Sequence, residues 1–488
     1  MSGRALSSIA AILAIAVALM GDAIARDPPH GARRVAARPA PRAASITRPN
    51  GANTAKLASI DREKARVDHR AAIAAVRQRV PKRPMPGEPG FTGVPPAGEH
   101  RFVPNELVLH VNPTVSAERL GDASRRLGLT RVASQNVGLT GGTLIHFRSA
   151  PGRPVADVVR ALEAEKIGIA QPNYVFRLQE VASLPARAKP GEIDQYVLGK
   201  LHLGEAHRLA TGNNVPVAVI DSEIDSKHPD LNGAVIEEFD AVGRADRPHP
   251  HGTGMAGAIA ARRALMGIAP AARVFAIHAF SPESAETAQA TTSHVIAGLE
   301  WAISKGARVI NMSFAGPYDP MLQLALKKAH DKGIVLIAAA GNLGPTSPPL
   351  YPAADPNVIA VTATDRNDKL FTQANQGPHI AVAAPGVDVL EPAPNGRYQL
   401  TTGTSVAAAH VSGVAALLIE RDASLSPDMI YEILTGSAKR LDGNGHNDRF
   451  GWGLVDPTRA LREVEARPVQ AQKHRPTGPA SAAAASAR

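Results

Sequence analysis

The sequence of 488 residues contains no cysteine. This absence excludes disulfide bonds, a cysteine nucleophile, a zinc ribbon and a thiol redox site. Apart from one run near the start, the chain also lacks any stretch near the roughly 20 apolar residues that cross a bilayer as a helix. Hydrophobic residues still make up 44% of the chain, which is ample for a sizeable core. The length predicts about three structural units.

The formal net charge of +10 is concentrated in two flanking segments. Residues 26–100 contain 15 Lys and Arg against 6 Asp and Glu, and residues 466–488 contain 4 basic residues and no acidic ones. Residues 101–465 therefore carry a net charge of −3. The part that we expect to fold is close to neutral, and the basic character belongs to its appendages.

Residues 1–25 have the pattern of a secretory signal peptide. Arg4 supplies the positive start, Ala5 to Met20 form an apolar run, and Ala23-Ile24-Ala25 gives the small-residue pattern that precedes cleavage. The run is short for a spanning helix, so an uncleaved anchor is the weaker alternative. We expect export to the periplasm or the medium, with no stable membrane span after signal cleavage.

Residues 26–100 are rich in Pro, Ala and Arg and almost free of aromatic residues. Such a segment cannot bury enough apolar surface to offset its ordering entropy, so we expect a disordered leader. Residues 57–80 could form a charged helix, but nothing in the sequence marks what it would pack against. A basic arm can bind nucleic acid, acidic polymer or a membrane surface, but the simpler interpretation is a solvated leader that is later discarded. We expect no nucleic-acid partner, and a disordered tail at 466–488.

Two folded units are expected between the leader and the tail. Residues 101–183 contain strands and helices in the order β-α-β-β-α-β, with Ser116 as a plausible helix N-cap, which predicts a small α+β unit. Residues 190–465 alternate short apolar strands with helices, which predicts an α/β fold with a parallel sheet buried on both faces. The expected strands of this second unit are 215–220, 274–280, 308–313, 334–339, 358–362 and 380–383, and the expected helices are 293–305, 321–332, 405–419 and 427–435.

Four polar side chains stand at the ends of these elements, where an open parallel sheet places its functional groups. Asp221 ends an apolar strand, His251 and Ser405 open small-residue helical segments, and Asn342 follows another strand. Each pattern alone is typical of a turn or a helix cap. Together they provide a nucleophilic hydroxyl, an imidazole base, a carboxylate to orient it and a donor for an oxyanion. The set therefore fits nucleophilic serine chemistry.

Residues 195–460 resemble a subtilisin-type serine protease, a subtilase. The matching pieces are Asp221-Ser222, His228-Pro-Asp-Leu231, His251-Gly-Thr253, Ala340-Gly-Asn342, Ala384-Pro-Gly386, Gly403-Thr-Ser405 and Gly451-Trp-Gly-Leu-Val-Asp456. The resemblance implies a subtilisin-like parallel sheet with helices on both faces and a serine endopeptidase activity. It implies Ser405 as the nucleophile, His251 as the general base and Asp221 as its orienting partner. Asn342 would donate to the oxyanion together with the Ser405 backbone N–H.

The resemblance also implies a substrate-binding edge and a propeptide. Ser313, Phe314, Ala315 and Gly316 occupy the place of the strand that pairs with an extended substrate, although ordinary core packing is an alternative for Phe314. Ala340 and Gly341 would form part of the primary specificity pocket. Residues 101–183 are similar to the family's ferredoxin-like inhibitory propeptide, with the junction between Leu178 and Tyr196. We therefore expect a monomeric proenzyme that acts on proteins or peptides and carries its own inhibitor.

Three residues depart from the family pattern. Glu223 stands in place of the usual Gly after Asp-Ser, Gly254 replaces a second histidine, and Ala409 replaces the proline before His410, itself expected to be a packing histidine. None of them removes a candidate catalytic atom. Glu223 nevertheless motivates the alternative of a catalytically silent subtilase fold that binds proteins.

No cofactor is expected for the chemistry. Calcium often stabilises members of this family, but no motif in the chain identifies a site. Residues 442–448 carry oxygen-bearing side chains at alternate positions, as calcium loops do. The sixth and twelfth positions are Asn447 and Gly453, whereas an EF-hand loop has Gly and Glu there. We expect a turn.

Overall fold

The apolar strands of residues 190–465 form one parallel sheet, as their pattern predicts. The structure, a computed structural model, describes residues 51–178, 181–185, 194–282 and 288–467. The strands are β6 (Pro216–Ser222), β7 (Val235–Asp240), β8 (Arg273–Pro282), β10 (Val309–Met312), β12 (Val335–Ala339), β13 (Ile359–Thr364) and β14 (Ile380–Pro385). They lie in the order β14-β13-β12-β10-β6-β8-β7, with every neighbouring pair parallel.

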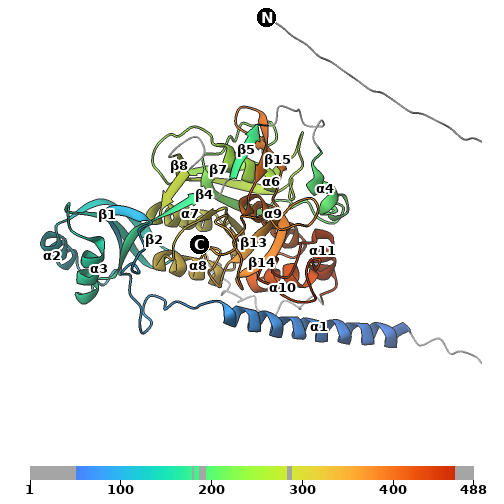
Figure 1. The fold of residues 1–488 in the computed structure, drawn as a ribbon, viewed down its shortest axis with the longest axis horizontal. Helices are drawn as coiled ribbons and strands as arrows, with labels where there is room; N and C mark the ends of the chain where they lie inside the picture. Colours follow the sequence, from blue (N-terminus) through green and yellow to red (C-terminus); the bar gives the residue numbers. More distant parts are fainter. Residues whose placement is uncertain (1–50, 179–180, 186–193, 283–287, 468–488) are drawn as a thin grey trace, which may run out of the picture. The chain divides into compact units, whose positions relative to one another are not determined.

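Helices cover both faces of this sheet (Figure 1). On one face lie α6 (Pro250–Ala260) and α9 (Thr404–Arg421), and on the other lie α7 (Thr292–Ser304) and α8 (Pro320–Asp331). Successive side chains of β6 enter the two cores in turn, Val217 and Val219 on the α6 and α9 side and Ala218 and Ile220 on the other. Because both faces are buried, the six expected strands read as apolar runs, whereas the edge strand β7 is only partly buried, carries two glutamates and was not expected. The α/β prediction is confirmed.

Four short helices complete this region. They are α4 (Tyr196–Lys200), α5 (Leu203–Ala206), α10 (Pro427–Ser437) and α11 (Pro457–Glu465). The expected start signal of α10 is present, because the Ser426 side chain accepts a hydrogen bond from Met429 N and Pro427 opens the helix. Of these helices, α10 and α11 contact each other, and α11 also packs against α9.

Residues 102–178 form the expected β-α-β-β-α-β unit. Its elements are β1 (Phe102–Val111), α2 (Ala117–Leu127), β2 (Leu129–Val137), β3 (Gly142–Ser149), α3 (Val155–Ala164) and β4 (Ile169–Leu178). The antiparallel strand order is β4-β1-β3-β2, the ferredoxin-like arrangement. Ser116 caps α2 by accepting from Arg119 N at 3.2 Å, as predicted. Both helices share an apolar core with this sheet.

The end of β4 runs between two strands of the larger unit. On one side Phe176 pairs with Ala290 of β9 (Ala288–Thr291), and on the other Leu178 pairs with Phe314 of β11 (Phe314–Ala315). Both pairings are antiparallel. Beyond it, β5 (Val181–Pro185) pairs with β16 (Arg397–Thr402), which forms a hairpin with β15 (Val389–Ala393). The small unit is therefore joined to the larger one by backbone pairing on both sides of its last strand.

The expected disorder of the leader is wrong for the part that the structure describes. Helix α1 (Gly51–Arg79) spans most of the charged stretch 57–80, for which a helix was the alternative. From Ile60 onward the described residues belong to one compact unit with the rest of the fold. The physical reason is that the basic residues of α1 pair with carboxylates almost 400 positions away, such as Arg66 with Glu463. The expected signal peptide, residues 26–50 of the expected leader and residues 468–488 of the expected tail lie outside the described residues.

No helix among the described residues combines the length and apolar character needed to cross a membrane.

Candidate active site

Asp221 and His251 form a buried pair at the carboxyl edge of the sheet. Asp221 is near the end of β6, and His251 lies in the first turn of α6. His251 Nδ1 lies 2.7 Å from Asp221 Oδ1, and neither side chain is exposed. The same carboxylate oxygen accepts from the backbone N–H and the hydroxyl of Ser222, at 2.7 and 3.0 Å. A carboxylate at Nδ1 requires the proton on that nitrogen, which makes Nε2 the basic nitrogen of the ring.

A glycine follows His251 because the chain passes close to β6 there. A Cβ at Gly252 would lie 2.4 Å from the carbonyl oxygen of Ser222. The Gly252 N–H instead donates to the Ser222 hydroxyl at 3.1 Å, which ties the first turn of α6 to the end of β6. The His-Gly sequence thus sets the distance between the histidine and the carboxylate.

Ser405 is the second residue of α9, a helix buried from Thr404 to Ile419. Its hydroxyl donates to the carbonyl oxygen of Ser313 at 3.2 Å, and the Ser313 hydroxyl donates back to the carbonyl oxygen of Ser405 at 3.0 Å. The backbone N–H of Ser405 is one of the first four of the helix, which have no acceptor within it and lie at its positive end. Gly386 makes this approach possible, since a Cβ there would lie 2.7 Å from the Gly403 carbonyl oxygen.

Asn342 is held at the start of α9 by Thr404. Its Oδ1 accepts from the Thr404 hydroxyl at 2.8 Å and from the Thr404 N–H at 3.1 Å. The Thr404 hydroxyl also accepts from the Gly341 N–H at 3.1 Å. Because Oδ1 accepts from Thr404, the amide nitrogen is the end of the Asn342 side chain that can donate. The structure thus brings Asn342 to the N-terminus that carries Ser405, and Thr404 is a positioning residue that the sequence analysis missed.

The expected substrate edge, Ser313 to Gly316, already pairs with a strand of the chain itself. Arg177 and Leu178 of β4 face Ala315 and Phe314 in the β11 ladder. The Phe314 ring is buried, with its centroid 5.8 Å from that of Phe176 and 4.8 Å from that of Phe280. The Phe314 side chain therefore packs in the core, while its backbone pairs with β4.

Two of the expected substrate-binding residues, Gly316 of the edge and Gly341 of the pocket, are glycines for steric reasons. A Cβ at Gly316 would lie 2.4 Å from Cδ1 of Phe176. At Gly341 the backbone has φ +109°, a conformation that side chains rarely adopt, and a Cβ would lie 2.7 Å from Leu350. Ala340 is buried and donates its N–H to the carbonyl oxygen of Val361. The loop 340–342 is thereby fixed between β13 and α9.

Glu223 belongs to an acidic cluster around a buried histidine that the sequence analysis missed. Glu223 Oε2 lies 3.3 Å and Asp240 Oδ1 3.1 Å from His278 Nδ1, and Asp246 Oδ2 lies 3.2 Å from its Nε2. Burial raises the pKa of Glu223, the neighbouring carboxylates raise it further, and His278 lowers it. A cavity of about 210 Å³ adjoins this cluster. The only sequence signal was a histidine that interrupts the apolar strand β8.

The other two residues that depart from the family pattern, Gly254 and Ala409, lie in well-packed surroundings. A Cβ at Gly254 would lie 2.6 Å from Oε2 of Glu391, so the carboxylate of β15 occupies the space next to this position. Ala409 is fully buried inside α9. The neighbouring His410 forms a 2.8 Å contact from Nδ1 to the Pro385 carbonyl oxygen, and burial lowers its pKa to about 4. It is therefore neutral at pH 7, in keeping with a packing role.

The segment 442–448 does not fit a calcium loop. Asn447 Oδ1 accepts from the backbone N–H groups of Arg449 and Phe450, and Asn447 Nδ2 donates to the Asp442 carbonyl oxygen. Asp448 pairs with Arg79. These oxygens and amides serve a turn and an ion pair. Across the described residues, no group of three or more His, Asp or Glu side chains is arranged to hold a metal ion.

The chain is also similar in sequence to proteins that are already known. Residues 212–453 match the model of the subtilase family. Subtilisin from Bacillus pumilus is 38% identical over 257 residues, which cover 50% of this chain and 90% of that protein. Subtilisin E from Bacillus subtilis (strain 168) is 38% identical over 257 residues, and the match spans 65% of its length.

A solved structure has the same fold. The crystal structure of fervidolysin from Fervidobacterium pennivorans, described as a keratinolytic enzyme related to subtilisin, superimposes with a TM-score of 0.64. The identity is 25%, and the match covers 78% of this chain and 64% of that chain. Its coverage of this chain extends beyond the residues matched by the family model.

Proposed function

The chain belongs to the subtilase family, and on that premise we propose that it is an exported serine endopeptidase made as a proenzyme. Its substrates are proteins or peptides. The observation that carries the proposal is the buried 2.7 Å contact between Asp221 and His251, at the sheet edge where α9 presents Ser405.

The proposed reaction uses Ser405 as the nucleophile. Its Oγ attacks the carbonyl carbon of the scissile bond while Nε2 of His251 takes the hydroxyl proton. The same proton then goes to the leaving amine as the C–N bond breaks, which leaves an acyl-enzyme. Water attacks the ester in the same way and releases the acid and free Ser405. Asp221 holds the Nδ1–H tautomer and stabilises the imidazolium that forms in both steps.

The oxyanion of each tetrahedral intermediate would be bound at the start of α9. Asn342 and the Ser405 backbone N–H are the proposed donors. The contacts from Thr404 to Asn342 Oδ1 support this role, because they fix the amide before substrate arrives. Preorganised donors of this kind stabilise charge without any reorganisation during the reaction.

The proenzyme proposal is supported by the position of β4. An extended peptide that adds a strand to a sheet edge gains affinity from backbone hydrogen bonds and specificity from side-chain pockets. The antiparallel pairing of Arg177 and Leu178 with β11 has this form. We propose that residues 101–183 inhibit the protease by holding this strand in the substrate site. Release requires a cut between Leu178 and Tyr196.

A catalytically silent fold is the less favoured alternative. It was motivated by Glu223, whose carboxylate lies 3.3 Å from His278 Nδ1, whereas Asp221 Oδ1 is in contact with His251 and Ser222. The departure therefore leaves the Asp221 to His251 contact in place.

The test compares the chain without residues 1–25 with its Ser405→Ala variant. Both are followed by intact mass and then given casein as substrate. We expect only the wild type to lose its N-terminal region by a cut between Leu178 and Tyr196, and then to digest casein. Two uncut, inactive chains would move the silent binding fold to the front.

A further inference from the structure

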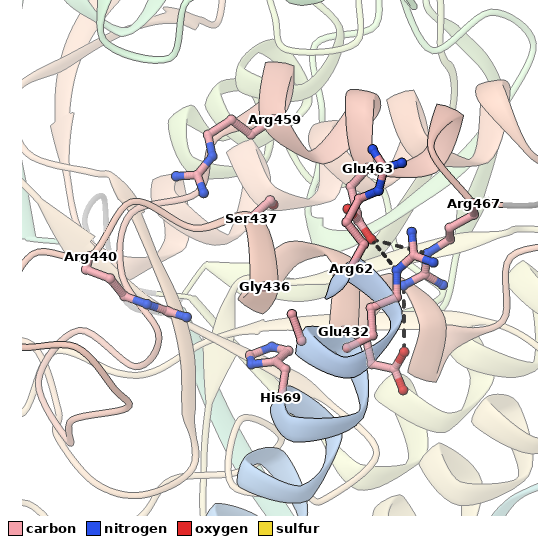
Figure 2. Close-up of a pocket in the computed structure, with 11 residues that line it drawn as sticks. Arg62, His69, Glu432, Gly436, Ser437, Arg440, Arg459, Glu463 and Arg467 are labelled. Carbon is pink, nitrogen blue, oxygen red and sulfur yellow. Dashed lines mark hydrogen bonds and ion pairs between the residues drawn. The ribbon is translucent and has the colours of Figure 1, made fainter. Parts of the chain in front are cut away.

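One face of helix α1 is basic and contacts α10 and α11, the C-terminal helices of residues 190–465, here called the protease region. Three arginines on this face pair with carboxylates of α10 and α11: Arg66 with Glu463 (2.8 Å), Arg70 with Glu432 (2.7 Å) and Arg77 with Asp428 (3.2 Å). Arg79, the last residue of the helix, pairs with Asp448 in the loop between α10 and α11 (2.8 Å). Figure 2 shows part of this contact, a cavity of about 380 Å³ lined by Arg62 and His69 of α1 and by Glu432 and Glu463. The surface that receives α1 thus offers carboxylates to its arginines, beside Arg440, Arg459 and Arg467 of the same surface.

The same face of α1 also buries apolar and aromatic surface. Ile73 is only 6% exposed and belongs to the core that includes α9 and α10. The His69 ring packs edge-on against Trp452 with centroids 4.6 Å apart, and the guanidinium of Arg77 lies 4.6 Å from the ring centroid of Tyr431. Burial lowers the pKa of His69. Shape and apolar burial thus accompany the ion pairs.

The segment after α1 continues along the protease region. The guanidinium of Arg83 lies 4.9 Å from the ring centroid of Tyr318, and the Tyr318 hydroxyl donates to the Pro84 carbonyl oxygen at 3.1 Å. Tyr318 follows β11 closely in the sequence. The chain N-terminal to the proposed junction therefore contacts the protease region at several places, among them α1 against α10 and α11, and β4 against β9 and β11.

We infer that α1 is a second anchor of the pro-region, the chain from residue 26 to the junction between Leu178 and Tyr196. It keeps the pro-region bound to the protease region after the junction is cut. The inference rests on the proposed proenzyme function. A cut after Leu178 removes the covalent link between the protease region and the segment that carries α1 and β4. While either α1 or β4 stays bound, it keeps the other at a high effective concentration near its own binding surface. If β4 leaves the substrate edge, the cut segment still does not dissociate from the protease region as long as α1 remains bound. The receptor for this basic helix is the surface of α10, α11 and the loop between them, which offers paired carboxylates and the rings of Tyr431 and Trp452.

The experiment uses the Ser405→Ala chain from residue 26 to 488, with a recognition sequence for an unrelated site-specific protease placed within residues 186–193. The cut is then independent of the chain's own activity. Dissociation of the cut pro-region is followed by native mass spectrometry at low ionic strength. We expect Arg70→Ala with Arg77→Ala to speed dissociation roughly 3- to 30-fold. The matched control, Lys64→Ala with Lys82→Ala, removes the same charge from exposed positions and should leave the rate unchanged.

A charge exchange distinguishes the loss of one ion pair from misfolding of the variant. Arg77→Glu alone should release the pro-region faster, and adding Asp428→Lys should restore slow release. Raising the salt concentration should narrow the difference between the variants and the wild type. Equal rates for wild type, test and control variants, or no restoration by the exchange, would overturn the anchor. Failure of the wild-type chain to cut itself would count against the protease proposal and leave this measurement intact.

Discussion

The contact between Gly316 and Phe176 gives a quantitative test of the inhibitory strand. Phe176 of β4 is fully buried, and a Cβ at position 316 would lie 2.4, 2.8 and 3.0 Å from three of its ring atoms. In Gly316→Ala the ring must move by about 1 Å, because non-bonded carbons pack at about 3.5–4.0 Å. Overpacking of this kind costs about 1–3 kcal/mol.

The assay is a double-mutant cycle on the thermal or urea stability of the uncut Ser405→Ala chain. Phe176→Ala alone should cost about 3–5 kcal/mol, the usual range for a buried Phe. In that background the new methyl group at position 316 meets open space. Gly316→Ala should then cost almost nothing, so the two changes should couple by about 1–3 kcal/mol.

The result that refutes this reasoning is an equal cost of Gly316→Ala with and without the Phe176 ring. Such a result would mean that β4 does not sit against β11 as described. It would also remove the main support for residues 101–183 as an inhibitor that occupies the substrate edge.

Three further predictions follow from other contacts. Asn342→Ala should lower kcat by about 10²–10³ in casein or peptide assays with little change in KM, a magnitude measured for the equivalent donor in a subtilisin. Gly254→His should destabilise the fold by at least ~1–3 kcal/mol in urea melts, and Glu391→Ala should relieve part of that loss, because the new Cβ lies 2.6 Å from that carboxylate. Burial raises the pKa of Glu106, but hydrogen bonds from His146 and other donors lower it to about 2. A depressed folded-state pKa gives stability that is present above pH ~4.5 and is lost as the pH falls toward 2, so Glu106→Gln should flatten the acid side of the stability profile. A Glu106→Gln chain with unchanged acid sensitivity would contradict that assignment.

The parallel strands were predictable from the sequence because both of their faces are buried. Runs such as 334–339 are continuously apolar, and they appear as β12 within one residue of the expected bounds. The two-residue strand β11 was expected only through the family resemblance. Its definition depends on pairing with β4, which is more than 130 positions away and is not encoded in local periodicity.

The candidate catalytic residues were found because each stands in an ordered small-residue motif. The structure shows the physical reason for those motifs, since Gly252 and Gly386 lie where any side chain would meet backbone. The cluster around His278 was not found, because its members come from separate elements and share no spacing. The packing of α1 was missed for the same reason, since its partners are hundreds of residues away.

The complete burial of α9 has a consequence for when the protease can first act. A helix without an exposed face over residues 404–419 cannot dock before the sheet and α6 are in place around it. Ser405, the proposed nucleophile, also lies more than 150 positions after Asp221 and His251, so it is the last of the three to be synthesised. Contacts between distant residues form late, after their loop-closure entropy has been overcome. The proposed site is therefore assembled late in folding, so a half-folded copy would have no complete site with which to cut its neighbours.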